Sequence, residues 1–188
     1  RISVDGDTST NDSLIILANG MAGNALITAP GPDYDAFTAA LKELCTAIAR
    51  AMAADGEGAK HLITCTVTGA ESEKDAETMA KSVIASTLTK SAVFGCDANW
   101  GRVICAMGYS GVSFDPKTVD ITFKSAAGQV PVCKNGMGLE FDEELAEKVL
   151  TEPEVEIIAD LKSGGGKATC WGCDITYDYI RINGDYRT

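Results

Sequence analysis

The amino-acid sequence predicts an α/β fold in which helices pack on a mixed, partly antiparallel sheet. Patterns typical of helices and of strands alternate along the 188 residues. Two strand-like runs within residues 119–134 are separated only by a turn near Ala127 and Gly128, which is typical of an antiparallel hairpin. Apolar residues form 45% of the chain, which is enough to build one hydrophobic core. We therefore expect residues 1–188 to form a single domain.

The first third of the chain predicts two short extended segments, a long helix and a strand. The extended segments are expected over residues 2–4 and 13–18, and a loop rich in glycine and proline follows them. A helix is predicted over 33–54, with Asp33 as its N-cap, because apolar side chains recur there every three or four residues. These side chains are Phe37, Leu41, Leu44, Ile48 and Met52. A strand over residues 59–68 should come next.

The middle of the chain predicts two further helices. The sequence SEKD at residues 72–75 is typical of a helix start, and an apolar stripe at helical spacing follows it. The stripe comprises Ala76, Met79, Ala80, Val83, Ile84 and Leu88. Asn99 is expected to cap the next helix, which spans residues 100–108. Both helices should pack on the sheet through their apolar faces.

The last third of the chain predicts mainly strands. A short acidic helix over residues 142–150 follows the hairpin. Strands are expected over 155–161 and 168–182, joined by a flexible glycine turn. The second of these strands is unusually long and continues almost to the C-terminus. Because chain ends usually fray, so strong a pattern indicates that this end is docked.

Composition and charge exclude several classes of function. The 16 Lys and Arg residues against 27 Asp and Glu residues give a net charge of −11, so no basic stripe is available for a nucleic-acid backbone. No apolar run approaches the roughly 20 residues that span a bilayer. The seven cysteines lie mostly within apolar patterns, as buried thiols do in a reducing compartment, so we expect a cytoplasmic protein. The sequence begins at Arg1 rather than at a methionine, and we expect it to be a piece of a longer chain.

Three short motifs resemble known sites but lack essential features. Cys170 and Cys173 have the CxxC spacing, but they fall in a predicted strand, where residues three apart point to opposite faces, and no second ligand pair completes a zinc site. The glycine turn at 163–166 is not a phosphate loop, because Ala168 replaces the required hydroxyl. The acidic run of residues 5–12 lacks the glycine and the glutamate of a calcium loop, so it is either a tight turn or the lining of a pocket. We therefore expect no metal.

Two single residues are further candidates. His61 is the only histidine, and no carboxylate that could orient it lies near it in sequence, so the sequence does not support a histidine-based nucleophile system. Glu57 lies between Gly56 and Gly58, which allow the backbone to turn tightly and present the carboxylate. From spacing alone, a solvated glutamate in a turn is the simpler interpretation of Glu57.

Three longer segments carry a resemblance to a known family. They are VDGDTSTND at residues 4–12, FGCDANWGR at 94–102 and YIRINGDYRT at 179–188. In this order they resemble the ornithine acetyltransferase family, the bifunctional glutamate N-acetyltransferases of arginine biosynthesis. The resemblance spans essentially the whole chain, and it implies the α/β sandwich shared with self-processing aminopeptidases.

The resemblance implies acyl transfer through a covalent intermediate. In this family a precursor cleaves itself before a threonine into an α chain and a β chain, and the new N-terminal threonine of the β chain is the nucleophile. A hydroxyl activated by its adjacent amine performs such chemistry without histidine. The threonine takes acetyl from N2-acetyl-L-ornithine and passes it to L-glutamate, and some members also use acetyl-CoA. The α chain supplies the oxyanion hole, no cofactor is needed, and two αβ units form a dimer.

The resemblance assigns substrate binding to Glu57, Asn183 and Thr188. Glu57 is implied to pair with a substrate ammonium, which ornithine provides, and Asn183 and Thr188 are the C-terminal pair of binding residues. The catalytic threonine of the family lies upstream of the position that matches Arg1. This chain is therefore expected to be most of a β chain without a catalytic residue, and to be inactive alone. Two alternatives stay open: an N-terminal-nucleophile aminopeptidase of the related fold, and a non-catalytic or thiol-redox module built on the CxxC pair.

Overall fold

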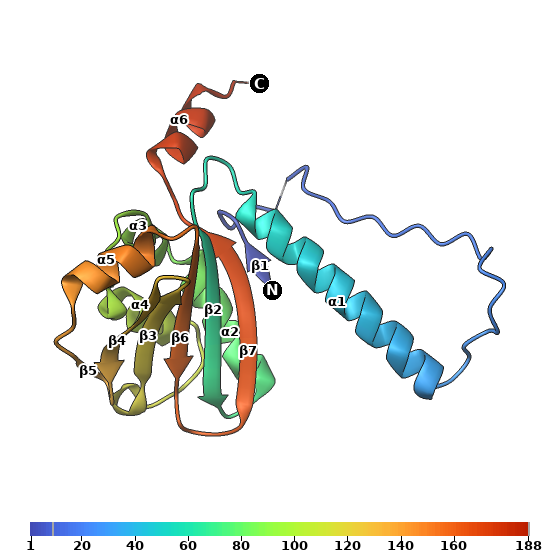
Figure 1. The fold of residues 1–188 in the computed structure, drawn as a ribbon, viewed down its shortest axis with the longest axis horizontal. Coiled ribbons are helices and arrows are strands. Elements are labelled where there is room, and N and C mark those ends of the chain that lie inside the picture. The colour runs from blue at the N-terminus through green and yellow to red at the C-terminus, as the bar shows by residue number, and fades with distance from the viewer. Residues whose placement is uncertain (9, 188) are drawn as a thin grey trace.

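A seven-stranded sheet with the order β1-β7-β2-β6-β3-β4-β5 forms the centre of the fold (Figure 1). The structure is a computed structural model that describes residues 1–8 and 10–187. β7 (Gly166–Cys173) lies between β1 (Ile2–Ser3), which runs parallel to it, and β2 (Leu62–Ala70), which runs antiparallel to it. The first and last strands of the chain are therefore neighbours.

The other half of the sheet is largely antiparallel. β6 (Glu154–Asp160) runs parallel to β2 and antiparallel to β3 (Asp120–Ser125). β3 forms the predicted hairpin with β4 (Gly128–Lys134), and β5 (Met137–Gly138) follows at the edge. A short 3-10 helix, Pro116–Thr118, leads into β3. This pairing confirms the mixed, partly antiparallel sheet predicted from the sequence.

Helices cover one face of this sheet and complete a single core. Alternate residues of β2, namely Ile63, Cys65 and Val67, are fully buried against them. The same apolar cluster takes in side chains from every helix of this layer. The helices are α2 (Glu73–Ala85), α3 (Thr87–Phe94), α4 (Trp100–Gly108) and α5 (Glu143–Thr151). None of the helices in the described part of the chain is long and apolar enough to cross a membrane.

Local capping signals located the starts of α2 and α4 correctly. The Ser72 side chain accepts a hydrogen bond from Asp75 N at 3.1 Å, at the predicted start of α2. The Asn99 side chain accepts one from Arg102 N at 3.1 Å, at the predicted start of α4. Each cap satisfies a backbone N–H group that has no partner within its helix.

The predicted stripe of α2 is wrong at its end. Ser86 interrupts the helix, and its side chain accepts a hydrogen bond from Thr89 N at 3.3 Å, which caps α3 instead. Leu88 consequently belongs to α3, where its side chain is 57% exposed rather than buried. A serine that caps a new helix outcompetes continuation of the old one, because its hydroxyl satisfies a free N–H group.

The long helix α1 (Pro32–Ala54) stands apart from the body of the fold (Figure 1), and Ala53 is its one buried residue. The helix was predicted, but its N-cap is Gly31, and Asp33 lies in the first turn, where its charge complements the helix dipole. The predicted strand at residues 13–18 is also wrong. That segment runs away from the sheet, so its backbone has no neighbouring strand with which to pair.

The predicted long C-terminal strand is wrong beyond Cys173. β2 begins at Leu62, which is paired with Cys173, so the sheet offers no partner to the residues that follow. Thr176 starts a helix instead, because its hydroxyl accepts a hydrogen bond from Tyr179 N at 3.1 Å. This helix, α6 (Tyr177–Asp185), projects from the end of the sheet (Figure 1).

Candidate functional site

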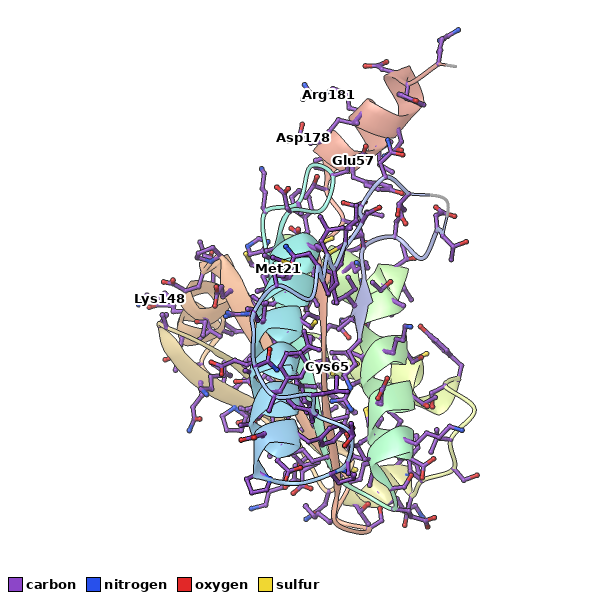
Figure 2. The ribbon with its side chains drawn as sticks, turned by 90° about the vertical axis from the view of Figure 1, so that its right-hand side faces the viewer. Met21, Glu57, Cys65, Lys148, Asp178 and Arg181 are labelled. Carbon is purple, nitrogen blue, oxygen red and sulfur yellow. The ribbon has the colours of Figure 1, made fainter. Side chains whose placement is uncertain are left out.

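An exposed carboxylate and an exposed amide meet at the base of α6. Asn183 Nδ2 donates hydrogen bonds to Glu57 Oε2 at 2.7 Å and to Tyr179 O at 3.0 Å. Glu57 lies in the loop between α1 and β2, 126 residues before Asn183 in the chain, and Figure 2 shows it beside the first turns of α6. The structure thus brings together Glu57 and Asn183, two of the three residues to which the resemblance assigns substrate binding. Thr188, the third, lies outside the described residues.

Two glycines shape the loop that carries Glu57. Gly58 has a φ of +65°, and a Cβ atom there would lie 2.7 Å from Tyr179 N. A Cβ atom on Gly56 would lie 2.6 Å from Cys173 Sγ. Both positions require glycine because the loop passes so close to α6 and β7. The Gly-Glu-Gly sequence therefore serves close packing and not only a tight turn.

A single hydroxyl joins α6 to the same loop. Thr176 Oγ1 donates a hydrogen bond to Gly58 O at 2.7 Å and accepts one from Tyr179 N at 3.1 Å. Thr176 is itself buried, so these bonds are shielded from water. The contact fixes the backbone on both sides of the Glu57–Asn183 pair.

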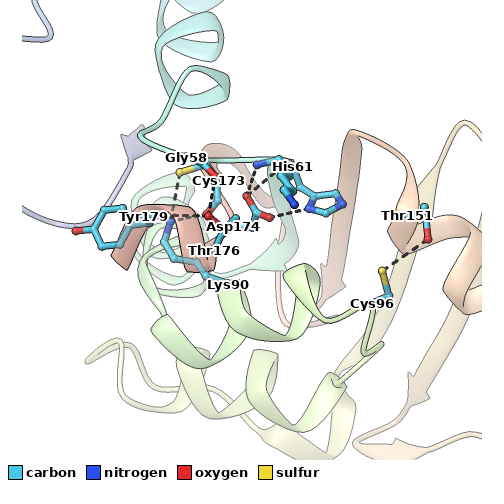
Figure 3. A network of polar contacts seen from close by, with 10 residues as sticks. Gly58, His61, Lys90, Cys96, Thr151, Cys173, Asp174, Thr176 and Tyr179 are labelled. Carbon is cyan, nitrogen blue, oxygen red and sulfur yellow. Dashed lines mark hydrogen bonds and ion pairs between the residues drawn. The ribbon is translucent and has the colours of Figure 1, made fainter. Parts of the chain in front are cut away.

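A buried histidine and carboxylate lie directly behind this loop. Asp174 accepts hydrogen bonds from Lys60 N at 2.8 Å and from His61 N at 3.1 Å, and its second oxygen lies 2.7 Å from His61 Nδ1 (Figure 3). Burial by itself raises the pKa of Asp174, but the bonds from His61 and the two backbone N–H groups outweigh it, and the net pKa is lowered. No carboxylate that could orient His61 lies near it in sequence, and the structure supplies one from 113 residues away in the chain.

The acidic run near the N-terminus reaches the same place. Asp5 Oδ2 accepts a hydrogen bond from the Tyr179 hydroxyl at 3.0 Å, and Asp5 Oδ1 accepts one from Asp7 N at 2.9 Å. Burial and the Asp5 carboxylate raise the pKa of Tyr179 to about 12, so the phenol stays neutral and donates. Asp5 also lines a small solvent-open cavity of about 60 Å³ together with Tyr179 and Asp174. Both interpretations of the acidic run therefore apply to Asp5, which closes a turn and also lines a pocket.

The two cysteines of the CxxC motif point to opposite faces of β7. Cys170 is paired with Cys65 across the sheet, and its Sγ lies 3.7 Å from Glu77 O of α2. Cys173 Sγ lies 3.9 Å from Val4 O. Burial raises the pKa of both CxxC thiols, whereas a redox dithiol requires adjacent sulfurs with lowered pKa values. This geometry does not support thiol-redox chemistry.

The fold and the site together define an α/β domain that presents an exposed glutamate, held by an asparagine amide, beside a small acidic cavity. Such a surface suits a ligand that carries an ammonium group. The chain belongs to the ArgJ family, whose model matches residues 1–188. This confirms the family to which the three sequence segments pointed.

Similar proteins and a similar structure cover the whole chain. It is 53% identical over 187 residues to the arginine biosynthesis bifunctional protein ArgJ 1 of Clostridium acetobutylicum, covering 100% of this chain and 46% of that protein. It is 49% identical to the arginine biosynthesis bifunctional protein ArgJ of Thermotoga neapolitana, with shares of 100% and 47%. A crystal structure of the bifunctional protein argJ from Bacillus halodurans matches with a TM-score of 0.89 and 44% identity, covering 99% of this chain and 86% of that one. The chain thus spans about half the length of the curated relatives it matches.

Sequence reasoning missed several polar residues of this region. Asp174 directly follows the CxxC motif, but its partner His61 lies too far away in the chain for spacing to connect them. Tyr179 lies within one of the family segments, yet its bond to Asp5 depends on α6 being a helix rather than a strand. The one signal in the sequence that could have linked Asp5 with Tyr179 was that both lie in segments that carry the family resemblance.

Proposed function

We propose that this chain is most of the β chain of a glutamate N-acetyltransferase, which transfers acetyl from N2-acetyl-L-ornithine to L-glutamate, and that residues 1–188 are one domain of it. The single observation that carries the proposal is the 2.7 Å hydrogen bond between Asn183 Nδ2 and Glu57 Oε2. It joins two residues from distant parts of the chain at one exposed place, as a common substrate site requires. The relatives, which are bifunctional proteins of arginine biosynthesis, agree with this activity.

Glu57 is the proposed partner of the substrate ammonium. Its Oε2 atom accepts the bond from Asn183, while its Oε1 atom makes no hydrogen bond to any other described residue. A carboxylate held by one neutral donor keeps its charge available to a cation, and a charge-assisted hydrogen bond of this kind contributes about 1.5–3 kcal/mol. Asn183 and Thr188 are the proposed binding residues at the other side of the substrate.

The proposed nucleophile is a threonine upstream of this chain. Its hydroxyl oxygen would attack the acetyl carbonyl of acetylornithine while its own amine takes the hydroxyl proton. Ornithine then leaves as the amine, and the amine of glutamate attacks the acetyl-threonine to give N-acetylglutamate and free threonine. The two half-reactions share one acyl-enzyme, so ping-pong kinetics are expected. Acetyl-CoA, which some members of the family use, is the proposed second donor in the same scheme, and no cofactor enters it.

The proposed partner of the chain is an α chain from the same precursor. The segment before α1 exposes a series of large apolar side chains, among them Leu17 at 91% and Leu26 at 86% exposure. On α1 itself, Phe37 and Leu44 are more than half exposed. Contiguous apolar surface of this kind is rare on monomers and marks an interface. We assign it to contact with the α chain and the upstream part of the β chain, with two αβ units forming a dimer in a reducing cytoplasm.

The proposal is tested with the full-length precursor that encodes this chain. The purified protein is incubated with N2-acetyl-L-ornithine and L-glutamate, N-acetylglutamate is measured, and the new N-terminal threonine peptide is weighed by mass spectrometry. We expect acetylglutamate to accumulate and the peptide to gain one acetyl group when glutamate is omitted. Release of N-terminal residues from peptides without acetyl transfer would instead identify the aminopeptidase alternative.

A further inference from the structure

A lysine that no step of the proposed transfer uses is buried behind the site. Lys90 of α3 is only 3% exposed. Its Nζ atom donates hydrogen bonds to Val4 O and to Cys173 O, each at 2.5 Å, and lies 3.9 Å from Cys173 Sγ. Figure 3 shows this side chain reaching from α3 toward Cys173. Burial of an ammonium group is costly unless it is well bonded, so this position is maintained by specific partners.

The charges around Lys90 show what stabilises the ammonium. Burial lowers the pKa of Lys90, and the nearby Cys173, Asp174 and Asp5 oppose that shift. Asp5 and Asp174 face the same cavity as Lys90. The lysine is therefore the positive centre of an otherwise acidic pocket wall.

Each carbonyl bound by Lys90 directly precedes an aspartate that holds another part of the site. Val4 precedes Asp5, which accepts the hydroxyl bond of Tyr179 on α6. Cys173 precedes Asp174, which accepts hydrogen bonds from Lys60 N and His61 N, at the end of the Glu57 loop just before β2. One ammonium thus links the exit of β1, the exit of β7 and, through their neighbours, both elements that carry the Glu57–Asn183 pair.

We propose that Lys90 is a positioning residue of the substrate site, which acts by fixing the backbone before Asp5 and Asp174 so that Glu57 and Asn183 stay within hydrogen-bond distance. This inference rests on the proposed function for the kinetic test with acetylornithine, whereas the hydrogen-exchange test does not depend on it. Lys90 forms no hydrogen bond with Glu57 or Asn183 themselves, so its effect is transmitted through the two aspartates.

The experiment replaces Lys90 in the full-length precursor. Lys90→Met keeps an unbranched side chain but removes the positive charge and the hydrogen-bond donors. Lys90→Arg keeps the charge and the donors, and the adjacent cavity leaves room for the larger head group. Lys81→Met, at an exposed position of α2, is the matched control. Steady-state kinetics with N2-acetyl-L-ornithine are combined with amide hydrogen exchange followed by mass spectrometry.

We expect Lys90→Met to raise the KM for acetylornithine by about tenfold or more, with a much smaller change in kcat. Exchange should accelerate at residues 56–60 and 174–183 and stay unchanged in β3 and β6. Lys90→Arg should restore both readouts in part, and Lys81→Met should alter neither. If Lys90→Met does not fold, Lys90→Gln is judged by the same criteria.

Three results would overturn the inference. The first is a KM in Lys90→Met equal to that of Lys81→Met, and the second is a loss of activity in Lys90→Met confined to kcat. The third is faster hydrogen exchange spread evenly over the whole sheet, which would mark Lys90 as a purely structural lysine. A wild-type protein without acetyl transfer would contradict the proposed function instead. The exchange measurement needs no activity, so it would still decide whether Lys90 orders the two segments.

Discussion

Thr176 and Gly58 are joined by a hydrogen bond of 2.7 Å between the threonine hydroxyl and the glycine carbonyl. This bond connects the start of α6 to the loop of Glu57, in which Gly58 adopts a φ of +65° beside Tyr179. The relative position of Glu57 and Asn183 therefore depends on backbone contacts behind them as much as on their own side chains.

Gly58→Ala should separate the two binding residues. A Cβ atom at this position would lie 2.7 Å from Tyr179 N, and the left-handed conformation costs a residue with a side chain about 1–2 kcal/mol. We expect faster hydrogen exchange in α6 and a raised KM for acetylornithine. Gly184→Ala in the same helix is the control, because a Cβ atom there meets nothing within 4 Å. Equal behaviour of the two variants would show that the close approach of the loop has no role.

Glu57→Gln should weaken the binding of acetylornithine. The substitution keeps the shape of the side chain and removes the charge proposed to pair with the ornithine ammonium. This interaction is worth about 1.5–3 kcal/mol, or roughly a 10- to 150-fold rise in KM. Glu71→Gln, at an exposed position beyond β2, controls for the loss of one negative charge. An unchanged KM and rate in Glu57→Gln would remove Glu57 from the site.

Deletion of Thr188 should damage activity more than stability. The resemblance places this residue in the C-terminal binding pair, and it follows an exposed stretch of chain that contributes nothing to the core. We expect kcat/KM to fall while the unfolding midpoint in guanidinium stays that of the wild type. Full activity in the enzyme that lacks Thr188 would mean that this residue does not contact substrate.

Asp174→Asn should remove a pH-dependent part of the stability. The pKa of Asp174 is lowered in the folded protein, so its contribution is fully present above its ordinary unfolded value of about 3.9 and is lost as the pH falls through the lower folded value. The difference in unfolding free energy between wild type and Asp174→Asn should therefore be constant near neutral pH and shrink below about pH 4. Denaturant unfolding at a series of pH values measures it, with Asp12→Asn, at an exposed position outside any helix, as control. A difference that grows on acidification would contradict the assignment.

Local sequence patterns determined several of the helices that pack on the sheet and one hairpin of the sheet itself. The Asn99 cap, the hairpin of residues 119–134 and the helix after Ser72 were all predicted. Each depends on interactions between residues close in the chain: a side chain bonds an N–H group three residues on at the two helix starts, and the hairpin pairs residues at most 12 positions apart. The residues Glu57 and Asn183 came from the resemblance, since spacing alone favoured a solvated turn for Glu57.

Only the tertiary structure decided which conformation the chain adopts after β7 and which polar groups meet at that end of the sheet. The residues after Cys173 have the composition of a strand. Cys173 is paired with Leu62, the first residue of β2, so the neighbouring strand offers no partner beyond it. The backbone therefore forms α6, in which it satisfies its own N–H and C=O groups. His61 and Asp174 are 113 residues apart in the chain, and Lys90 binds carbonyls 86 and 83 residues away. Contacts of this range depend on how the elements pack, which no periodicity within a short window contains.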